Sequence, residues 1–267
     1  MAREKIIDFH THIFPDTLAA RALSKISVQI GLSSGELYSD ATALGTEKVL
    51  SEIGIDRAAV CNIAVTPERE GAVNSFAISL LKNPFFIPLG SVHPKSRNKE
   101  NEIERLWISG IKGVKLHPDF MQTPLSDEGY GEIFSLLSER GMFALIHSGN
   151  NPFREEAALS TPEKIAKIRE KFNTLTIVAA HLGGFGMAER SVNALSGSGV
   201  YLDTSLSALS GENLYNIIEA FGEDYILFGS DTPWSNPRRE LSFIQNLPVS
   251  EGAKRKILCF NALKLIL

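Results

Sequence analysis

Two histidines, His10 and His12, are separated by a single residue near the N-terminus, at the end of an apolar run. Alternate side chains of a β-strand lie on the same face, so we expect Asp8, His10 and His12 to point to one side. Two imidazoles about 7 Å apart along a strand face can converge on one metal ion. The pattern therefore predicts part of a metal site, and other segments must supply the remaining ligands.

Short apolar segments alternate with helical segments along the whole chain. The expected strands cover residues 6–12, 57–65, 85–92, 111–116, 142–147, 175–181, 200–204 and 225–229. Nearly continuous apolar strands separated by helices are typical of a parallel sheet that is covered on both faces. Eight such units in 267 residues predict an α/β fold, a (β/α)₈ TIM barrel in which residues 1–267 form a single domain. An open doubly wound sheet has less support, because no glycine-rich nucleotide-binding motif follows a strand.

The segment after the first strand is longer than an ordinary loop of such a barrel. Residues 14–46 have helical character in 16–30 and are rich in glycine and serine in 31–35. We expect an insertion beside the mouth of the first strand, which is a candidate lid. Further helices are expected at 46–53, 68–82, 100–109, from 126 onwards, 238–246 and 250–266. Thr161, followed by Pro162 and Glu163, predicts a capped helix start.

Functional side chains of a (β/α)₈ barrel lie at the carboxyl ends of its strands. All six histidines of the chain follow this rule, and none falls in an expected helix. They are His10, His12, His93, His117, His147 and His181. Asp231 follows the eighth expected strand in the same way. This clustering predicts a polar site at one end of the barrel.

The ordered set of motifs resembles the amidohydrolase superfamily of metal-dependent barrel hydrolases. The matching segments are IIDFHTH at 6–12, ALIHSG at 144–149, VAAHLGG at 178–184 and FGSDTPW at 228–234, with a similar closing helix around 256–262. GVKLHP at 113–118 and GSDTPW at 229–234 look most similar to the amidohydrolase-related branch, which includes aminocarboxymuconate semialdehyde decarboxylase. The resemblance implies one divalent ion held by His10, His12, His147 and Asp231. It also implies that His181 acts as a catalytic acid or base.

Three imidazoles and one carboxylate suit Zn²⁺ with a water in the remaining position. Mn²⁺, Fe²⁺ and Co²⁺ are compatible with the same ligand types. A metal-activated water would hydrolyse an amide, ester or lactone of a small molecule, with Asp231 accepting a proton and His181 stabilising the developing charge. The alternative is a nonoxidative decarboxylase of an aromatic or muconate-type acid on the same site. A third reading is a barrel that binds a ligand without catalysis, and the complete ligand set argues against it.

Hydrolysis is the preferred activity at this point. The chain has little room for a large inserted substrate domain, and no arginine matches a motif for a carboxylate clamp. Arg154 could grip a substrate carboxylate, although a solvated loop arginine is the more ordinary interpretation.

Three further residues are candidates for supporting roles. Lys115 could bridge two metal ions, as carbamylated lysines do in other branches, but binding a substrate anion or pairing with an aspartate is the favoured interpretation. His117 is expected to line the pocket, whereas His93 is expected to be structural. Asp8 could support a metal ligand by a hydrogen bond, or be an ordinary buried carboxylate.

The bulk properties exclude several classes of partner. A net charge of −4 gives no electrostatic case for nucleic acid or anionic membrane. The deoxyribonuclease-like branch also lacks support, because its glutamate after the fourth strand is Lys115 here. No apolar run approaches the roughly 20 residues of a membrane helix, and no signal peptide precedes the first strand. We expect a cytoplasmic enzyme of small molecules, with two core cysteines (Cys61 and Cys259) and a homodimer as the default assembly.

Overall fold

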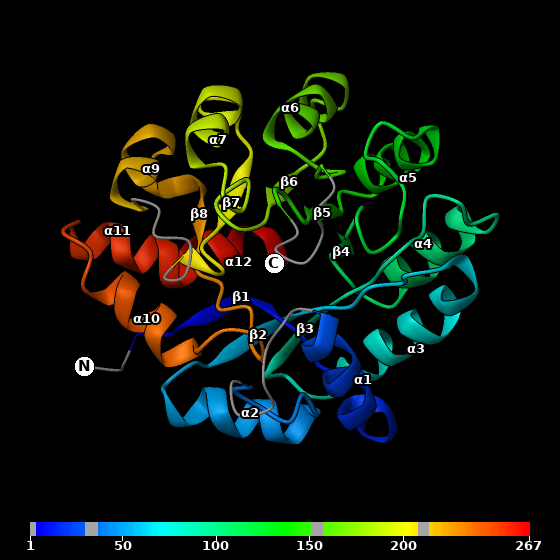
Figure 1. The fold of residues 1–267 in the computed structure, drawn as a ribbon, viewed down its shortest axis with the longest axis horizontal. Coiled ribbons are helices and arrows are strands. Elements are labelled where there is room, and N and C mark those ends of the chain that lie inside the picture. Colours follow the sequence, from blue (N-terminus) through cyan, green and yellow to red (C-terminus); the bar gives the residue numbers. More distant parts are fainter. Residues whose placement is uncertain (1–3, 30–36, 151–156, 208–213) are drawn as a thin grey trace.

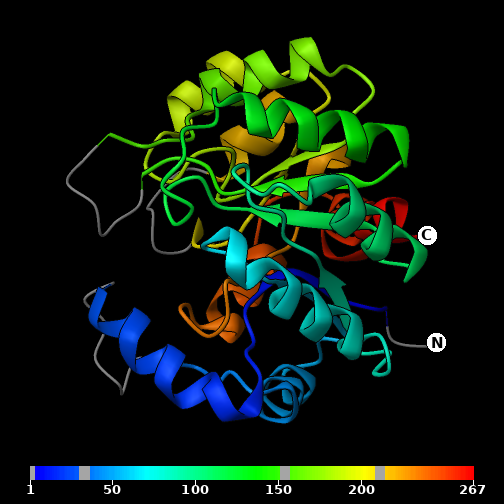
Figure 2. The same cartoon turned by 90° about the vertical axis from the view of Figure 1, so that its right-hand side faces the viewer.

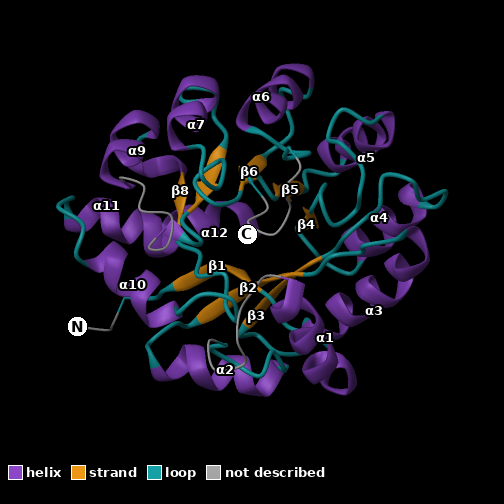
Figure 3. Ribbon diagram, in the orientation of Figure 1, coloured by secondary structure: helices purple, strands orange, loops and turns teal. Residues whose placement is uncertain are grey.

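The computed structural model describes residues 4–29, 37–150, 157–207 and 214–267. Eight parallel strands follow one another around a ring, with helices outside them (Figures 1 and 3). The strands are β1 (Ile7–Thr11), β2 (Arg57–Cys61), β3 (Phe86–Leu89), β4 (Gly113–Leu116), β5 (Phe143–Ile146), β6 (Ile177–Ala179), β7 (Tyr201–Asp203) and β8 (Ile226–Leu227). Arg154 lies outside the described residues.

Backbone hydrogen bonds close the ring at two seams. The regular ladders join β1-β2-β3 and β4-β5-β6-β7-β8 into two sheets. Between β3 and β4, the Gly90 N–H donates to the Gly113 carbonyl at 3.1 Å. Between β8 and β1, the Asp231 N–H donates to the His10 carbonyl at 2.8 Å. These contacts confirm the predicted (β/α)₈ barrel, although most strands are shorter than expected.

The helices that cover the barrel are α1 (Asp16–Gln29), α2 (Ala43–Glu52), α3 (Glu70–Leu80), α4 (Lys99–Ile108), α5 (Glu128–Glu139), α6 (Pro162–Lys171), α7 (Ala188–Leu195), α9 (Leu214–Phe221), α10 (Pro237–Gln245), α11 (Glu251–Arg255) and α12 (Asn261–Ile266). A π-helical turn at Lys256–Phe260 joins α11 to α12, where one continuous helix was predicted. In Figure 2, α12 and the N-terminus lie at one end of the barrel, and α1 extends towards the other. Among the described residues, no helix has the length and apolarity needed to cross a membrane.

Two apolar layers hold the elements together, because successive strand residues point to opposite faces. Ala58 and Val60 of β2 pack in the layer beneath the helices, together with Leu106 of α4. Ala59 and Cys61 of the same strand pack in a second cluster, built from alternate residues of several other strands, inside the barrel. Residues of α12 close that cluster at the end of the barrel where the N-terminus lies.

A β-bulge in β1 overturns one expectation. Asp8 pairs with Ala58 and Thr11 with Val60, so β1 carries one residue more than β2 over this stretch. The extra residue breaks the alternation of side chains. His10 and His12 therefore share a face, but Asp8 does not share it with them.

Asp8 instead holds the β1–β8 seam. Its carboxylate accepts hydrogen bonds from the Ser230 N–H at 2.9 Å, the Ser230 hydroxyl at 2.5 Å and the His10 N–H at 3.1 Å. Burial raises the pKa of Asp8 to about 7, against these hydrogen bonds, which lower it. Within the described part of the chain, the side chain makes no hydrogen bond to an imidazole ring and does not line the cavity described below. Asp8 is thus a buried carboxylate that positions the backbone of His10 and Ser230.

Two predicted helix starts also differ. α2 begins at Ala43, three residues early, because the Thr42 hydroxyl accepts from the Gly45 N–H at 3.0 Å. Thr161 does precede α6, but its hydroxyl donates to Glu163 at 2.7 Å and caps no backbone N–H.

Replacing Asp8 with alanine should lower the free energy of unfolding by about 3 to 5 kcal/mol, because three buried donors lose their acceptor. Urea denaturation followed by circular dichroism measures the change. Glu170→Ala, on the exposed side of α6, is the charge-matched control and should stay within about 0.5 kcal/mol of the parent. A loss below about 1 kcal/mol for Asp8→Ala would contradict this account of the seam.

Candidate active site

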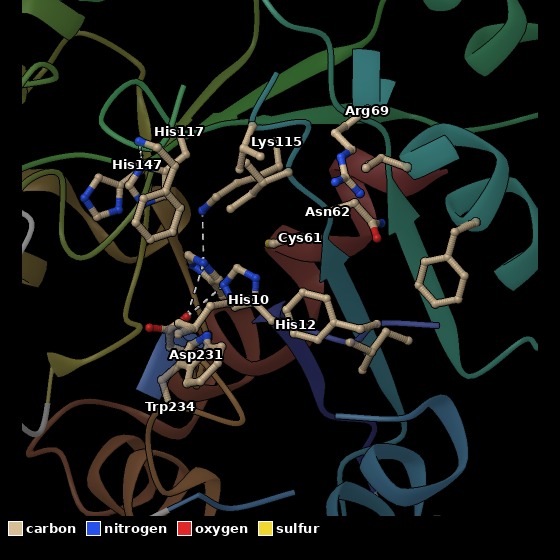
Figure 4. A pocket seen from close by; sticks show the side chains of 18 of the residues that line it. His10, His12, Cys61, Asn62, Arg69, Lys115, His117, His147, Asp231 and Trp234 are labelled. Atoms are coloured by element: carbon tan, nitrogen blue, oxygen red, sulfur yellow. Dashed lines mark hydrogen bonds and ion pairs between the residues drawn. The ribbon is translucent and has the colours of Figure 1, made fainter. Parts of the chain in front are cut away.

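A cavity of about 440 Å³ opens at the carboxyl ends of the strands, within the size range of small-molecule sites (Figure 4). Every predicted site residue except Asp8 lines it. These residues are His10, His12, Lys115, His117, His147, His181 and Asp231. His93 lies outside the cavity, and its Nδ1 accepts from the Lys95 N–H, in line with the structural role expected for it.

Three of the four predicted metal ligands converge. The Asp231 Oδ1 lies 3.1 Å from the His12 Nε2 and 3.5 Å from the His10 Nε2. The bulge in β1 turns both imidazoles inward, and the seam hydrogen bond holds the backbone of Asp231 beside His10. Two imidazoles and a carboxylate with their donor atoms this close can hold a divalent ion.

His147, the fourth predicted ligand, lies beside this group and not within it. Its Nδ1 is 3.1 Å from the His181 Nε2, and its ring stacks on His117 at a centroid distance of 3.9 Å. Its Nε2 is buried and has no hydrogen-bond partner among the described residues. A buried imidazole nitrogen without a partner is costly unless a ligand satisfies it. This orphaned nitrogen therefore fits a cation-binding role, although His147 groups with His117 and Asp119 and not with the three converging donors.

Burial keeps most of these imidazoles uncharged. His10 is the exception, because burial lowers its pKa but Cys61 and the carboxylate of Asp203 raise it to about 10. Desolvation lowers the pKa of His181 to about 4, and it lowers the pKa of His12 as well. Burial and the neighbouring imidazoles hold the pKa values of His117 and His147 well below the usual range. Neutral imidazole is the form that binds metal ions. Burial would raise the pKa of Asp231, but attraction to His10 and the His12 hydrogen bond lower it to about 2.

Lys115 reaches the same group from β4. Its side chain is 1% exposed, and its Nζ lies 3.0 Å from the His10 Nε2. The contact is with a histidine, whereas pairing with an aspartate was one of the expectations. The ammonium faces the lone pair that a metal ion would use, so the two cations cannot occupy the position together.

A buried carboxylate that was not predicted lies behind His10. The Asp203 Oδ2 is 2.9 Å from the His10 Nδ1, and Asp203 is completely buried. Burial opposes its charge, but attraction to His10 and their hydrogen bond hold its pKa well below the usual value. Asp203 is the last residue of β7 and lies one residue before the end of the strand predicted at 200–204, so the rule that identified the histidines could have found it.

The cavity wall away from this polar group is largely apolar. Phe14 and Trp234, which flank metal-ligand motifs in the sequence, both line it, as do Leu18 and Ile26 of the predicted insertion. Arg69, which the sequence interpretation missed, also lines the cavity (Figure 4). It lies between β2 and α3, inside the helix expected at 68–82, so the strand-end rule did not identify it.

Comparison with solved structures shows the same fold in three proteins, two of which are decarboxylases. An uncharacterised TIM-barrel protein of Bordetella bronchiseptica is 20% identical, with a TM-score of 0.79 and 98% of each chain covered. A 5-carboxyvanillate decarboxylase of Novosphingobium aromaticivorans, complexed with manganese and 4-hydroxy-3-methoxy-5-nitrobenzoic acid, is 18% identical, with a TM-score of 0.76 and coverage of 98% of this chain and 96% of that one. A dihydroxybenzoic acid decarboxylase of Polaromonas, with bound manganese and 2-nitroresorcinol, is 16% identical, with a TM-score of 0.75 and coverage of 99% and 97%.

No curated protein sequence matches the chain. The amidohydrolase family model, in contrast, matches residues 7–266, which is nearly the whole chain. The motif set and the polar group at the barrel end agree with that match. The resemblance seen in the sequence is thus confirmed, and the chain belongs to the amidohydrolase family.

Proposed function

We propose that this protein is a metal-dependent nonoxidative decarboxylase of a small aromatic acid. This was the alternative to hydrolysis in the sequence interpretation, and it now has the better support. The observation that carries it is the cavity itself, which combines a cation-binding group at its base with aromatic and aliphatic walls. The decarboxylases among the structural neighbours support the same choice.

The walls suit a planar ring. Phe14, Phe76, Phe120, Phe185 and Trp234 contribute aromatic surface to one cavity. Aromatic rings pack against one another in offset or edge-to-face arrangements, and such walls also exclude water. An amide or ester hydrolase must admit a water to the reacting carbon. Decarboxylation needs only a proton there.

The residues at the base fit a divalent ion, as the convergence of His10, His12 and Asp231 and the orphaned His147 Nε2 indicate. When bound, such an ion supplies a fixed positive charge and Lewis acidity towards an anionic substrate. Zn²⁺ was the ion predicted from the ligand types. Two of the structural neighbours contain bound manganese, so Mn²⁺ is the first ion to test.

Residues of the chain itself would then bind the substrate and move the proton. Lys115 and Arg69 are cations in the cavity wall, and each can hold a carboxylate or phenolate oxygen of the substrate. His181 is the residue that we assign to move the proton. The His181 Nε2 would take up a proton from solvent and pass it to the ring carbon, where the bond to the carboxylate breaks and CO₂ leaves. The His181 Nε2 faces the His147 Nδ1 in this structure, so proton transfer through Nε2 requires this hydrogen bond to open.

Purified protein loaded with Mn²⁺ should release CO₂ from at least one member of a panel of hydroxybenzoic acids, with the decarboxylated ring as the other product. His181→Asn should lower kcat by about 10²- to 10⁴-fold, because proton transfer to the ring carbon loses its carrier. Chromatography of the ring product together with CO₂ capture measures the reaction. Turnover of esters, lactones or amides without CO₂ release from any acid would favour the hydrolase instead.

Metal analysis by plasma mass spectrometry should find about one divalent ion per chain, the stoichiometry implied by a mononuclear site. His12→Ala and Asp231→Asn should each lose it, since both remove a converging donor atom. His93→Gln is the matched control, because His93 lies at the same end of the barrel but outside the cavity, and it should retain the ion. Two ions per chain would instead support a bridging Lys115.

Lys115→Met separates substrate binding from metal binding. Loss of a charge-assisted hydrogen bond should raise KM for the acid about 10- to 100-fold. The affinity for Mn²⁺, measured by titration without substrate, should stay equal or increase, because the ammonium no longer opposes the cation at the His10 Nε2. A loss of bound metal in this variant would contradict the assignment.

A further inference from the structure

We propose that Ser205 is a positioning residue that fixes which nitrogen carries the proton in the linked pair His181 and His147. The unprotonated Nε2 of His147 is thereby kept available as a ligand. The inference rests on the proposed function only in that a cation is the intended ligand. It concerns a hydroxyl that does not line the cavity and that contacts His10 at Nδ1, 3.0 Å away, and not at the converging Nε2.

The proton order begins at the carboxylate of Asp203, which can only accept hydrogen bonds when ionised. Its Oδ1 accepts from the backbone N–H groups of His181 and Ser205, both at 3.1 Å, and from the Ser205 hydroxyl. Its Oδ2 accepts from the His10 Nδ1 at 2.9 Å. The single hydroxyl hydrogen of Ser205 is therefore committed to Asp203.

The second step assigns the proton of His181. Its Nδ1 lies 2.8 Å from the Ser205 Oγ and 3.4 Å from the Ser205 carbonyl oxygen. Because the serine hydrogen is already used, both oxygens can only accept from this nitrogen. A neutral imidazole carries one proton, so His181 holds it on Nδ1 and presents a lone pair at Nε2.

The third step carries this order to His147. Its Nδ1 lies 3.1 Å from the His181 Nε2, and two nitrogens at this distance need one hydrogen between them. His147 must supply it, because the Nε2 of His181 is a lone pair. The proton of His147 therefore lies on Nδ1, and its Nε2 is left as the buried lone pair without a partner among the described residues.

Asp203 fixes the tautomer of His10 directly. The His10 Nδ1–H donates to the Oδ2, so the His10 Nε2 is an acceptor, in agreement with the Lys115 Nζ donor 3.0 Å away. One buried charge thus determines the tautomers of three histidines on β1 and after β5 and β6. Hydrogen bonds to the outer nitrogen of a metal-binding histidine commonly fix its tautomer in this way. In this protein the hydrogen bonds reach His147 indirectly, through Ser205 and His181.

Removal of the Ser205 hydroxyl should interrupt this series of hydrogen bonds at His181. In Ser205→Ala, His181 loses the acceptor Oγ at its Nδ1, and either nitrogen can then carry the proton. A proton on the Nε2 of His181 would force His147 to accept at Nδ1 and to place its own proton on Nε2. The lone pair intended for a cation would be lost.

Long-range ¹H–¹⁵N correlation spectra of metal-free protein with ¹⁵N-labelled histidine report the tautomers directly. We expect His10, His147 and His181 to show a protonated Nδ1 and an unprotonated Nε2. Ser205→Ala should give mixed tautomers at His181 and His147 but not at His10, and Ser205→Thr, which retains a hydroxyl, should restore the parent pattern. Ser191→Ala is the control, because Ser191 is equally buried but donates to the Leu182 carbonyl and contacts no imidazole.

Titration with Mn²⁺ alone provides the second readout. Ser205→Ala should bind the ion about 10- to 100-fold more weakly than the parent and Ser191→Ala. A protonated Nε2 on His181 in the parent spectrum would overturn the proposal whether or not a variant folds, and so would an unchanged spectrum in Ser205→Ala. Neither readout needs turnover. A protein with the predicted tautomers but no decarboxylation would refute the proposed function and leave this inference intact.

Discussion

The charge on the buried Asp203 is the constraint on which the rest of the site depends. An ionised carboxylate without access to water must be surrounded by donors, and those donors come from different parts of the barrel. His10 arrives from β1, the His181 N–H from the end of β6, and Ser205 from the turn after β7. Satisfying one charge therefore fixes the position of two histidines and, through His181, the orientation of His147.

The β1–β8 seam supplies the other half of the geometry. The bulge in β1 turns His10 and His12 inward together, and Asp8 holds the backbone of His10 against Ser230. Asp231 follows Ser230 directly, so the same contact brings its carboxylate to both imidazoles. Since these contacts lie at the carboxyl ends of the strands, the site forms only when the ring closes.

Much of this was visible in the sequence, because the strand order and the placement of all six histidines depend on local patterns. The family and the barrel followed from those patterns and are confirmed. The bulge was missed because it depends on how β1 pairs with β2, which alternation alone cannot reveal. The partners of Asp8 and Lys115 depend on which strands meet across the barrel. Asp203 was overlooked although it follows the strand-end rule. Arg69 was missed because it fell inside the helix expected at 68–82, and without Arg69 hydrolysis was preferred.

We propose that one cation binds where His10, His12 and Asp231 converge and that the Lys115 ammonium moves away from it. Anomalous diffraction at the manganese edge from crystals soaked in Mn²⁺ tests this most directly. The account predicts one peak about 2.0 to 2.3 Å from the Nε2 atoms of both histidines and from the aspartate, with the Lys115 Nζ moved away from His10. A lysine still in contact with the His10 Nε2, with no peak beside it at saturating Mn²⁺, would contradict the claim.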